Sequence, residues 1–371
     1  MSVRAAAALA AGMGIGRFVY TPILPLMTAQ AGLSTAAAAS LATANYLGYF
    51  VGAIATVVRA PSRVANPVAL VLLVATLAGM PLTHSMAAWF ALRLVAGVAS
   101  AVVFVAAVNA RPGWGMAGVG AGIALSGLVV LGFGQWQATW WVAAGVAAAL
   151  GVVAWGLRPD APKLSDLPAT IGVGPRSPLG AGEPGSIQRQ ATRRAFGFLF
   201  AAYTLEGVGY IIAATFLVAA ISGPLGSSAW IVVGLAAALS PTIIKPGRYT
   251  LPAALAVQAA GIALPALING SALIATLLFG GTFIGIAATA LNQGTALGIP
   301  NAPAILTADY SAGQIIGPLL ATPLLKSGYD QALLLAAAIV ATAAITALAP
   351  PSRHRAASQR PHQNAPKAPA E

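Results

Sequence analysis

Long apolar runs divided by short polar breaks dominate this chain. Residues 18–58 carry no charge and divide once, at residues 32–34, where glycine and serine favour a turn. Three further uncharged runs divide in the same way, namely 112–157 at 132–135, 207–244 at 222–228, and 249–308 at 269–271. Because a helix needs about 20 mostly apolar residues to cross the hydrocarbon core of a membrane, each run predicts a pair of membrane helices.

Over the whole chain, this pattern predicts an all-α membrane protein with twelve transmembrane helices in two six-helix bundles. The helices are expected at residues 5–29, 37–58, 64–83, 87–109, 113–134, 136–157, 195–221, 229–245, 249–268, 271–293, 302–325 and 330–349. The predicted regions are an N-terminal bundle (1–157), a cytoplasmic linker (158–193), a C-terminal bundle (194–349) and a disordered cytoplasmic tail (350–371). The apolar stretch 5–11 has the character of a signal peptide, but Arg17 and the spans behind it favour a membrane helix.

The composition excludes several classes of protein. Of the 371 residues, 58% are hydrophobic and 7% are charged, whereas soluble domains carry about 25% charged residues. A net charge of +12 could indicate nucleic-acid binding, but the basic residues lie between the apolar runs and form no solvated patch. There is no cysteine, and the three histidines occupy a loop and the tail, so we expect no metal site and no cofactor.

The distribution of lysine and arginine predicts the orientation in the membrane, because short loops rich in these residues stay cytoplasmic. With the N-terminus inside, sixteen of the nineteen basic residues fall on the cytoplasmic side, Lys326 falls outside, and Arg17 and Arg93 lie within helices. All seven tryptophans lie near predicted helix ends, where the headgroup region favours them. We therefore expect a multi-pass protein of the cell (inner) membrane with both termini in the cytoplasm.

A weak internal repeat relates the two predicted bundles. Gly14-Ile15-Gly16-Arg17 in the first predicted helix corresponds to Gly207-Val208-Gly209-Tyr210 in the seventh, at an offset of 193 residues. Chance recurrence of this glycine pattern is the alternative in a chain with 41 glycines. The pairing of the first helix of each half favours a parallel repeat of six helices, which is typical of many transporters.

Several dense motifs resemble a known family. They are MGIGRFVYTPILPLM at residues 13–27, ANYLGY at 44–49, LEGVGYII at 205–212, FGGTFIGI at 279–286 and GQIIGPLL at 313–320. In this order they resemble the YbfB/YjiJ-like group of the major facilitator superfamily (MFS). The resemblance spans both halves and implies the major facilitator fold and a transporter that works by alternating access, but it does not specify the substrate.

Two wider patterns of the superfamily are partly present. Arg93 and Gly97 resemble an Arg-x-x-x-Gly motif that the superfamily associates with proton coupling. Residues 118–134 lack the proline of the antiporter motif, and the loop 59–63 lacks the acidic residue of the usual loop motif. The direction of transport therefore stays open between drug or metabolite efflux and uptake of an organic anion.

Four ionisable residues lie inside predicted helices, namely Arg17, Arg93, Glu206 and Asp309. Each costs roughly 2.5–3.5 kcal/mol on insertion scales, so such residues face a water-filled cavity or a partner. The resemblance implies that the first, fourth, seventh and tenth helices line the cavity, and three of the four charges fall on that set. Asp309 is expected to make a structural hydrogen bond at a helix interface.

Helical spacing extends these charges into polar stripes, because residues three, four and seven apart share a face. The predicted substrate and proton pathway comprises Arg17, Arg93, Glu206, Tyr20, Asn45, Tyr49, Tyr203, Tyr210, Asn292 and Gln293. The alternative is that the polar side chains only join neighbouring helices. Arg17 and Glu206 could likewise form a structural ion pair.

The favoured function is a secondary transporter of a small organic solute that is coupled to protons through Glu206. The partners are then membrane lipid, the solute and protons, without nucleic acid, and we expect a monomer. Three alternatives are weaker. A primary pump lacks a phosphate-binding loop in this chain, a membrane enzyme lacks clustered catalytic groups, and a channel does not explain the two-half repeat. The protein is thus predicted to have no catalytic residues.

Overall fold

The computed structural model describes residues 2–62, 64–110, 113–157, 184–220, 225–245, 247–327 and 329–349. Most of the predicted linker, residues 221–224, the predicted tail, Arg63 and Arg111 lie outside the described residues, and the side chain of Lys326 is not described. In the described part of the chain every regular element is helical.

The N-terminal half contains six membrane spans. Its elements are α1 (Ser2–Leu9), the π-helix η1 (Ala10–Ile15), α2 (Tyr20–Ala31), α3 (Thr35–Val58), α4 (Ala65–Gly79), the 3₁₀ turn η2 (Met80–Leu82), α5 (Met86–Asn109), η3 (Gly113–Met116), α6 (Ala117–Phe133) and α7 (Trp136–Ala154). The elements α1, η1 and α2 together form the first span, residues 2–31.

The C-terminal half contains the other six spans. Its elements are α8 (Pro184–Ala220), α9 (Leu225–Ile243), α10 (Thr250–Leu267), α11 (Ala272–Ala296), α12 (Ala302–Ala321), the 3₁₀ turn η5 (Thr322–Ser327) and α13 (Asp330–Ala347). Among the described residues, ten spans are long and apolar enough to cross a membrane by composition alone. The apolar part of α9 is shorter, and α12 carries Asp309 and Gln314. With these two, the predicted twelve-helix all-α fold is confirmed.

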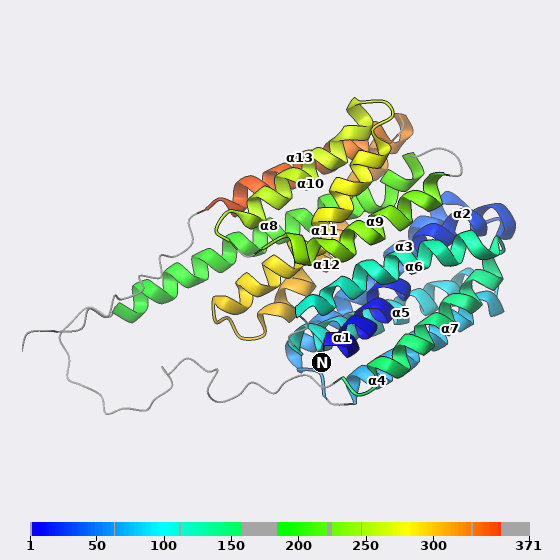
Figure 1. Ribbon diagram of the computed structural model, residues 1–371, viewed down its shortest axis with the longest axis horizontal. Helices are drawn as coiled ribbons and strands as arrows, with labels where there is room; N and C mark the ends of the chain where they lie inside the picture. The colour runs from blue at the N-terminus through cyan, green and yellow to red at the C-terminus, as the bar shows by residue number, and fades with distance from the viewer. Residues whose placement is uncertain are drawn as a thin grey trace, which may run out of the picture.

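The two halves form neighbouring bundles. Figure 1 shows α1 to α7 gathered in one body and α8 to α13 in the other, with the long axes of the helices running in a common direction. Between the halves, α6 packs along α9 and α3 packs along α12. At the α6–α9 contact, a Cβ atom added at Gly120 would collide with the backbone of Ala238, and one added at Gly234 with that of Ala124. Glycine thus allows the closest approach of the two bundles.

Three predicted helix boundaries differ from the structure for identifiable reasons. The first span is not one α-helix but is interrupted between Leu9 and Tyr20. The helix that contains the seventh span begins at Pro184 and not at residue 195, because the polar and charged residues before the apolar part also form helix and proline is favourable in the first helical turn. The eleventh span changes to a 3₁₀ turn at Thr322, because Pro323 cannot donate a backbone hydrogen bond.

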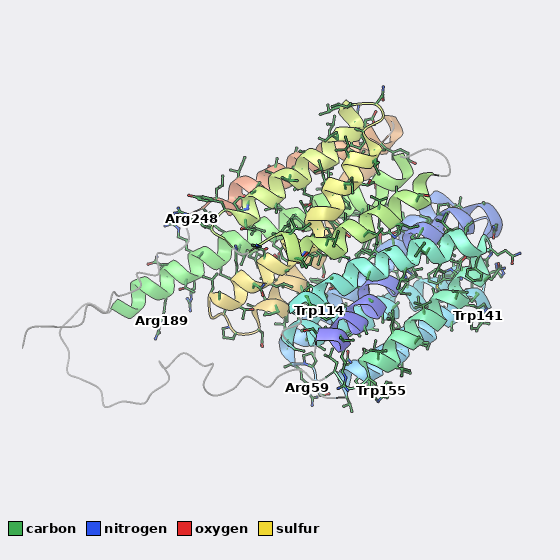
Figure 2. The ribbon with its side chains drawn as sticks, in the orientation of Figure 1. Arg59, Trp114, Trp141, Trp155, Arg189 and Arg248 are labelled. Atoms are coloured by element: carbon green, nitrogen blue, oxygen red, sulfur yellow. The ribbon has the colours of Figure 1, made fainter. Side chains whose placement is uncertain are left out.

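The tryptophans divide into two groups. Trp114, Trp141 and Trp155 are exposed, as expected of aromatic anchors at the membrane surface (Figure 2). The other four, Trp89, Trp136, Trp140 and Trp230, are buried among helices. Their position near helix ends therefore reflects packing within the protein and not contact with lipid headgroups.

Candidate functional site

The interruption of the first span places Arg17 in the middle of the protein. Backbone N–H groups of Gly16 and Phe18 bond to carbonyls five residues back, at 2.8 and 3.1 Å, which is the π-helical pattern. Pro22 has no N–H for the carbonyl of Phe18, which accepts instead from Thr21 at 3.2 Å. The chain therefore leaves the regular helix between residues 16 and 19 and resumes at Tyr20.

Arg93 on α5 supports this interruption. Its side chain is 2% exposed, and its two terminal nitrogens donate to the carbonyls of Gly16 at 3.4 Å and Arg17 at 3.3 Å. The ring of Tyr20 lies 4.8 Å from the guanidinium carbon, within range of a cation–π contact. Backbone groups freed from a helix inside a membrane need such partners. Arg93 thus holds the backbone on which Arg17 is mounted.

A close contact between α3 and α5 fixes this support. Asn45 of α3 donates from Nδ2 to the carbonyl of Arg93 at 3.1 Å. One turn further along α5, a Cβ atom added at Gly97 would lie 2.7 Å from the backbone nitrogen of Tyr49 and would collide with the carbonyl of Asn45. Gly97 thereby lets α3 approach closely enough for Asn45 to reach Arg93 and for Tyr49 to reach Arg17.

The guanidinium of Arg17 is covered on its face but only partly bonded at its edge. Its carbon lies 4.1 Å from the ring centroid of Tyr49 and 5.5 Å from those of Tyr46 and Phe18. One terminal nitrogen donates to Oε1 of Gln314 on α12, in the opposite half. Among the described residues, Nε and the other terminal nitrogen are buried without a hydrogen-bond partner. Arg17 therefore carries a buried positive charge with unused donors.

A small central cavity adjoins Arg17, with a volume of about 20 Å³, which is room for about one water molecule. Residues from both halves line it, namely Met13, Arg17, Phe18, Tyr49, Phe104, Met116 and Val119 from the first half and Tyr203, Ile284, Ala287, Thr307, Tyr310 and Gln314 from the second. The first, fourth, seventh and tenth spans all contribute, as the resemblance implied.

Glu206 lies behind the cavity wall. It is 1% exposed on α8 and does not line the cavity. Its carboxyl group faces the side chains of Gln258 on α10 and Tyr310 on α12. Within the described structure, Oε1 of Glu206, both amide atoms of Gln258 and the hydroxyl of Tyr310 are buried without an aligned hydrogen-bond partner. In the same part of the chain, the structure shows no ion pair between Glu206 and Arg17.

Asp309 makes the interface contact that was expected of it. The hydroxyl of Thr204 on α8 donates to Oδ1 of Asp309, so this pair joins α8 and α12. Its second oxygen, Oδ2, is buried without a partner in the described part of the protein. Asp309 is thus a structural link between the two helices, with one acceptor left over.

Aromatic rings form the wall between Arg17 and Glu206. Tyr203 stacks on Tyr310 with centroids 4.6 Å apart, and Tyr210 stacks on Phe283 at 4.3 Å. Phe18, next to Arg17 in the chain, meets Phe283 edge-on at 6.0 Å and so extends the wall across the two halves. Tyr310 both lines the cavity and faces Glu206, so it is the side chain that connects the two sites.

The structure brings together some of the predicted pathway residues and separates others. Arg17, Tyr49 and Tyr203 line the cavity. Three more are buried next to it: Arg93 and Asn45 support the interrupted span, and Tyr20 donates to the carbonyl of Ala38 at 2.9 Å. Glu206 and Tyr210 lie within the second half, behind the cavity. Asn292 is exposed, Gln293 is half-buried, and both lie near the end of α11 and away from the cavity lining.

Sequence reasoning missed Gln258, Gln314 and Tyr310. Gln258 is alone on an apolar helix face, where no stripe of polar residues marks it, whereas Gln314 continues a stripe with Thr307, Tyr310 and Ser311 that the sequence analysis did not follow. Their common signal was an uncharged polar side chain in the middle of a membrane span, which is costly to bury unless it has a partner. The partners are charged residues more than 50 positions away in the chain, and no local pattern reveals them.

The first glycine of each pair in the internal repeat has an equivalent contact. A Cβ atom added at Gly14 would collide with Gly122 in the fifth span, and one added at Gly207 would lie 2.7 Å from the carbonyl oxygen of Tyr310 in the eleventh span. The fifth span of the first half corresponds to the eleventh span of the chain. The second glycines differ, since a Cβ atom at Gly16 would meet Leu73 in the third span and one at Gly209 would meet Val340 in the twelfth. The two described spans also differ in that the first is interrupted and α8 is continuous.

Comparisons with known proteins give a consistent result. The family model described as uncharacterised MFS-type transporter YbfB matches residues 9–348. Among solved structures, the human organic anion transporter MFSD10 (TETRAN) is similar, with a TM-score of 0.60, 16% identity, and 93% of this chain and 99% of that chain covered. A point mutant of the nucleoside transporter NupG has a TM-score of 0.63, 12% identity and coverage of 94% and 98%. Among curated proteins, no sequence matches the chain.

Proposed function

The chain belongs to the YbfB-like family of major facilitator transporters, and from this premise we propose that it moves a small organic anion by alternating access, coupled to protons. The protein is a multi-pass membrane transporter. Two points go beyond family membership. The negative charge of the solute is inferred from Arg17, and the proton as the coupling ion is inferred from Glu206. Import and export are both compatible with it.

The observation that carries the proposal is the unbalanced charge of Arg17. It lines the central cavity, and no acidic side chain lies among the described lining residues. A guanidinium with free donors on its edge suits a carboxylate, because it presents parallel N–H groups in a fixed geometry. An anionic solute entering between the halves would supply the missing negative charge.

Glu206 is proposed as the proton carrier. It is the one fully buried carboxylate that faces unpartnered polar groups in the described part of the chain. Burial in apolar surroundings favours the neutral form of a carboxyl group, whereas a nearby positive charge favours the ionised form. Since Tyr310 lies between Glu206 and the cavity, occupancy of the cavity by an anion can affect the proton affinity of Glu206.

The remaining predicted residues have supporting roles in this proposal. Arg93, Tyr20 and Asn45 hold the interrupted span, while Tyr49, Tyr203 and Tyr210 form the walls. Asn292 and Gln293 would belong to the entrance of the pathway. We also propose that the protein is located in the inner membrane, with both termini in the cytoplasm. It is proposed to be a monomer with two bundles, residues 1–157 and 194–349, a cytoplasmic linker at 158–193 and a tail at 350–371.

The proton proposal is tested with Glu206→Gln in proteoliposomes. First, a panel of carboxylates, each paired with its neutral amide, is screened by thermal stabilisation of the purified protein, since a ligand stabilises the state that it binds. For a carboxylate that stabilises the protein, accumulation driven by a pH gradient should fall to the level of empty liposomes in Glu206→Gln. Asp330→Asn, an exposed carboxylate at the start of α13, should transport as the wild type does. Undiminished accumulation by Glu206→Gln would refute the coupling role.

The anion proposal is tested in the same screen. Arg17→Ala should weaken carboxylate binding by about 1.5–3 kcal/mol, the value of a hydrogen bond to a charged group. Binding of neutral amides, if any is detected, should not change by this amount. If the carboxylates stabilise Arg17→Ala as they stabilise the wild type, and the variant transports them equally well, the substrate is not recognised through this residue.

A further inference from the structure

Gln314 accepts a hydrogen bond from Arg17 across the cavity in this conformation. It is 1% exposed on α12, and its Oε1 accepts from a terminal nitrogen of Arg17 on the other side of the cavity. Both residues line the cavity, which holds no more than about one water molecule. Within the described residues, no other aligned hydrogen bond from the Arg17 side chain is found, although the hydroxyl of Tyr49 also faces it.

This bond differs from the other side-chain bonds that join the halves. Trp230 donates to the hydroxyl of Ser126 at 3.1 Å, and Asn301 donates to the carbonyl of Val57 at 3.4 Å, so both join neutral groups. The bond to Gln314 joins a buried cation to a neutral amide. The amide satisfies one donor but leaves the charge uncompensated, which is costly in apolar surroundings.

The cavity is too small for an organic solute in this conformation, so a solute must separate Arg17 from the facing wall before it can bind. The nearest acceptor on that wall is the Gln314 oxygen already bonded to Arg17. A solute oxygen that bonds to the same donor has to replace it. A carboxylate does so with a gain, because it adds the opposite charge that the amide lacks, and an opposite charge is strongly attracted to a buried cation. A neutral solute oxygen only exchanges one neutral acceptor for another.

We propose that Gln314 is an internal substitute for the substrate's anionic group. It holds Arg17 in the empty transporter and makes opening selective for solutes that carry a carboxylate or similar oxyanion. Gln314 is thus a specificity-determining residue in the second half, matched to a charge in the first half. The proposal rests on the anion-binding role of Arg17 in the proposed function and adds the group with which the anion competes.

The absence of cysteine from the chain allows a test that requires no known substrate. Ala287→Cys places a single thiol in the cavity wall. It is labelled in purified protein with two methanethiosulfonates of similar size, the anionic 2-sulfonatoethyl and the neutral 2-hydroxyethyl reagent. The ratio of the two labelling rates reports the anion affinity of the cavity. A change in the reactivity of the thiol or in general accessibility cancels in this ratio.

Gln314→Leu removes the substitute acceptor and should raise the anionic-to-neutral ratio about tenfold, the lower end of what a cavity of one sign does to counter-ion concentration. Gln314→Glu places a carboxylate against Arg17 and should lower the ratio below that of the wild type. Adding Arg17→Ala to Gln314→Leu should abolish the increase. Ser126→Ala, which removes a neutral bond between the halves, should leave the ratio unchanged.

An equal increase of both rates in Gln314→Leu would mean that Gln314 only packs the halves together, and it would overturn the proposal. An unchanged ratio would overturn it as well. The labelling assay does not involve transport or Glu206. If Glu206→Gln fails to uncouple transport while the labelling ratios behave as expected, the proton assignment falls and the role of Gln314 stands.

Discussion

Arg17 and Arg93 are equally buried, at 2% exposure each, but they bind different kinds of acceptor. Arg93 donates both terminal nitrogens to backbone carbonyls of the interrupted span, whereas Arg17 donates one to a side chain across the cavity. A backbone carbonyl of the first span cannot move away from Arg93 unless that part of the span unfolds. An acceptor on a side chain of the other half can be exchanged, so only Arg17 is available to a solute.

Arg93→Met should destabilise the protein, because the carbonyls of Gly16 and Arg17 lose their donors inside the membrane. The expected loss is about 1–3 kcal/mol for each unsatisfied carbonyl. Arg93→Lys should recover part of it, since an ammonium group cannot fork onto both carbonyls. Tryptophan fluorescence during thermal unfolding in detergent measures the effect, and the exposed Arg248→Gln serves as the control. If Arg93→Met unfolds at the wild-type temperature, Arg93 does not support the span.

At this scale the sequence identified the charges but not their partners. The cost of a charge in a membrane predicted that Arg17, Arg93 and Glu206 each face a water-filled cavity or a partner. Arg17 lines the cavity and Arg93 donates to backbone carbonyls, whereas Glu206 is buried behind the cavity lining. The partner of each depends on which helices pack together. Gln314 lies 297 positions from Arg17, so no spacing rule could connect them. The possible ion pair between Arg17 and Glu206 is not found among the described residues, where Arg17 donates to Gln314 and Glu206 faces Gln258 and Tyr310.

Among the elements, the contact of α3 with α5 has the tightest geometry near the site. Gly97 and Gly48 each place their helix directly on the backbone of the other, at Asn45 and Leu94 respectively. Small residues allow such contacts in membranes, where the hydrophobic effect does not drive helices together. The contact thereby determines the distance between the ring of Tyr49 and the guanidinium of Arg17. Packing between two helices thus determines the environment of a third.

Gly97→Leu should disrupt this packing, because its side chain would have to displace the backbone of α3. Overpacking of this kind costs typically about 1–3 kcal/mol and moves the neighbouring elements. Gly145→Leu on α7 is the matched control, since no heavy atom lies within 4 Å of a Cβ built there. Unfolding midpoints of the two variants should therefore differ, with Gly145→Leu close to the wild type. Equal midpoints would show that α3 and α5 can separate at no cost.

The helices themselves were predictable to within a few residues wherever apolar length alone determined them. Two of the three exceptions, in the first and eleventh spans, share a cause, which is local backbone chemistry. Glycine and Pro22 interrupt the first span, and Pro323 ends the regular part of α12. Periodicity locates a span in the sequence, but it does not distinguish a continuous helix from a broken one that other helices support.

For the whole molecule, the distribution of basic residues predicts which face is cytoplasmic. Figure 2 shows the labelled Arg59, Arg189 and Arg248 toward one end of the molecule and Trp141 toward the other. Arg59 lies between the second and third spans and Arg248 between the eighth and ninth, so the two halves present their basic loops on the same face. This agreement is what the positive-inside rule requires of a single orientation.

Single cysteines introduced into the cysteine-free chain can test this orientation. In intact cells, a membrane-impermeant maleimide should label His84→Cys and Asn269→Cys, which are exposed at the ends opposite the basic loops. Ala60→Cys and Arg248→Cys should be labelled only after the membrane is permeabilised. The reverse labelling pattern would place both termini outside the cell and would contradict the proposed orientation in the membrane.

The order in which the chain is synthesised adds a constraint on the interrupted span. At about 5–20 residues per second, the ribosome makes Arg93 roughly 4–15 s after Arg17, and Gln314 roughly 15–60 s after it. The first span therefore leaves the ribosome with a charged side chain and two backbone carbonyls that have no partner yet. Its stable insertion must wait for α5, so the fourth span completes the first during biogenesis.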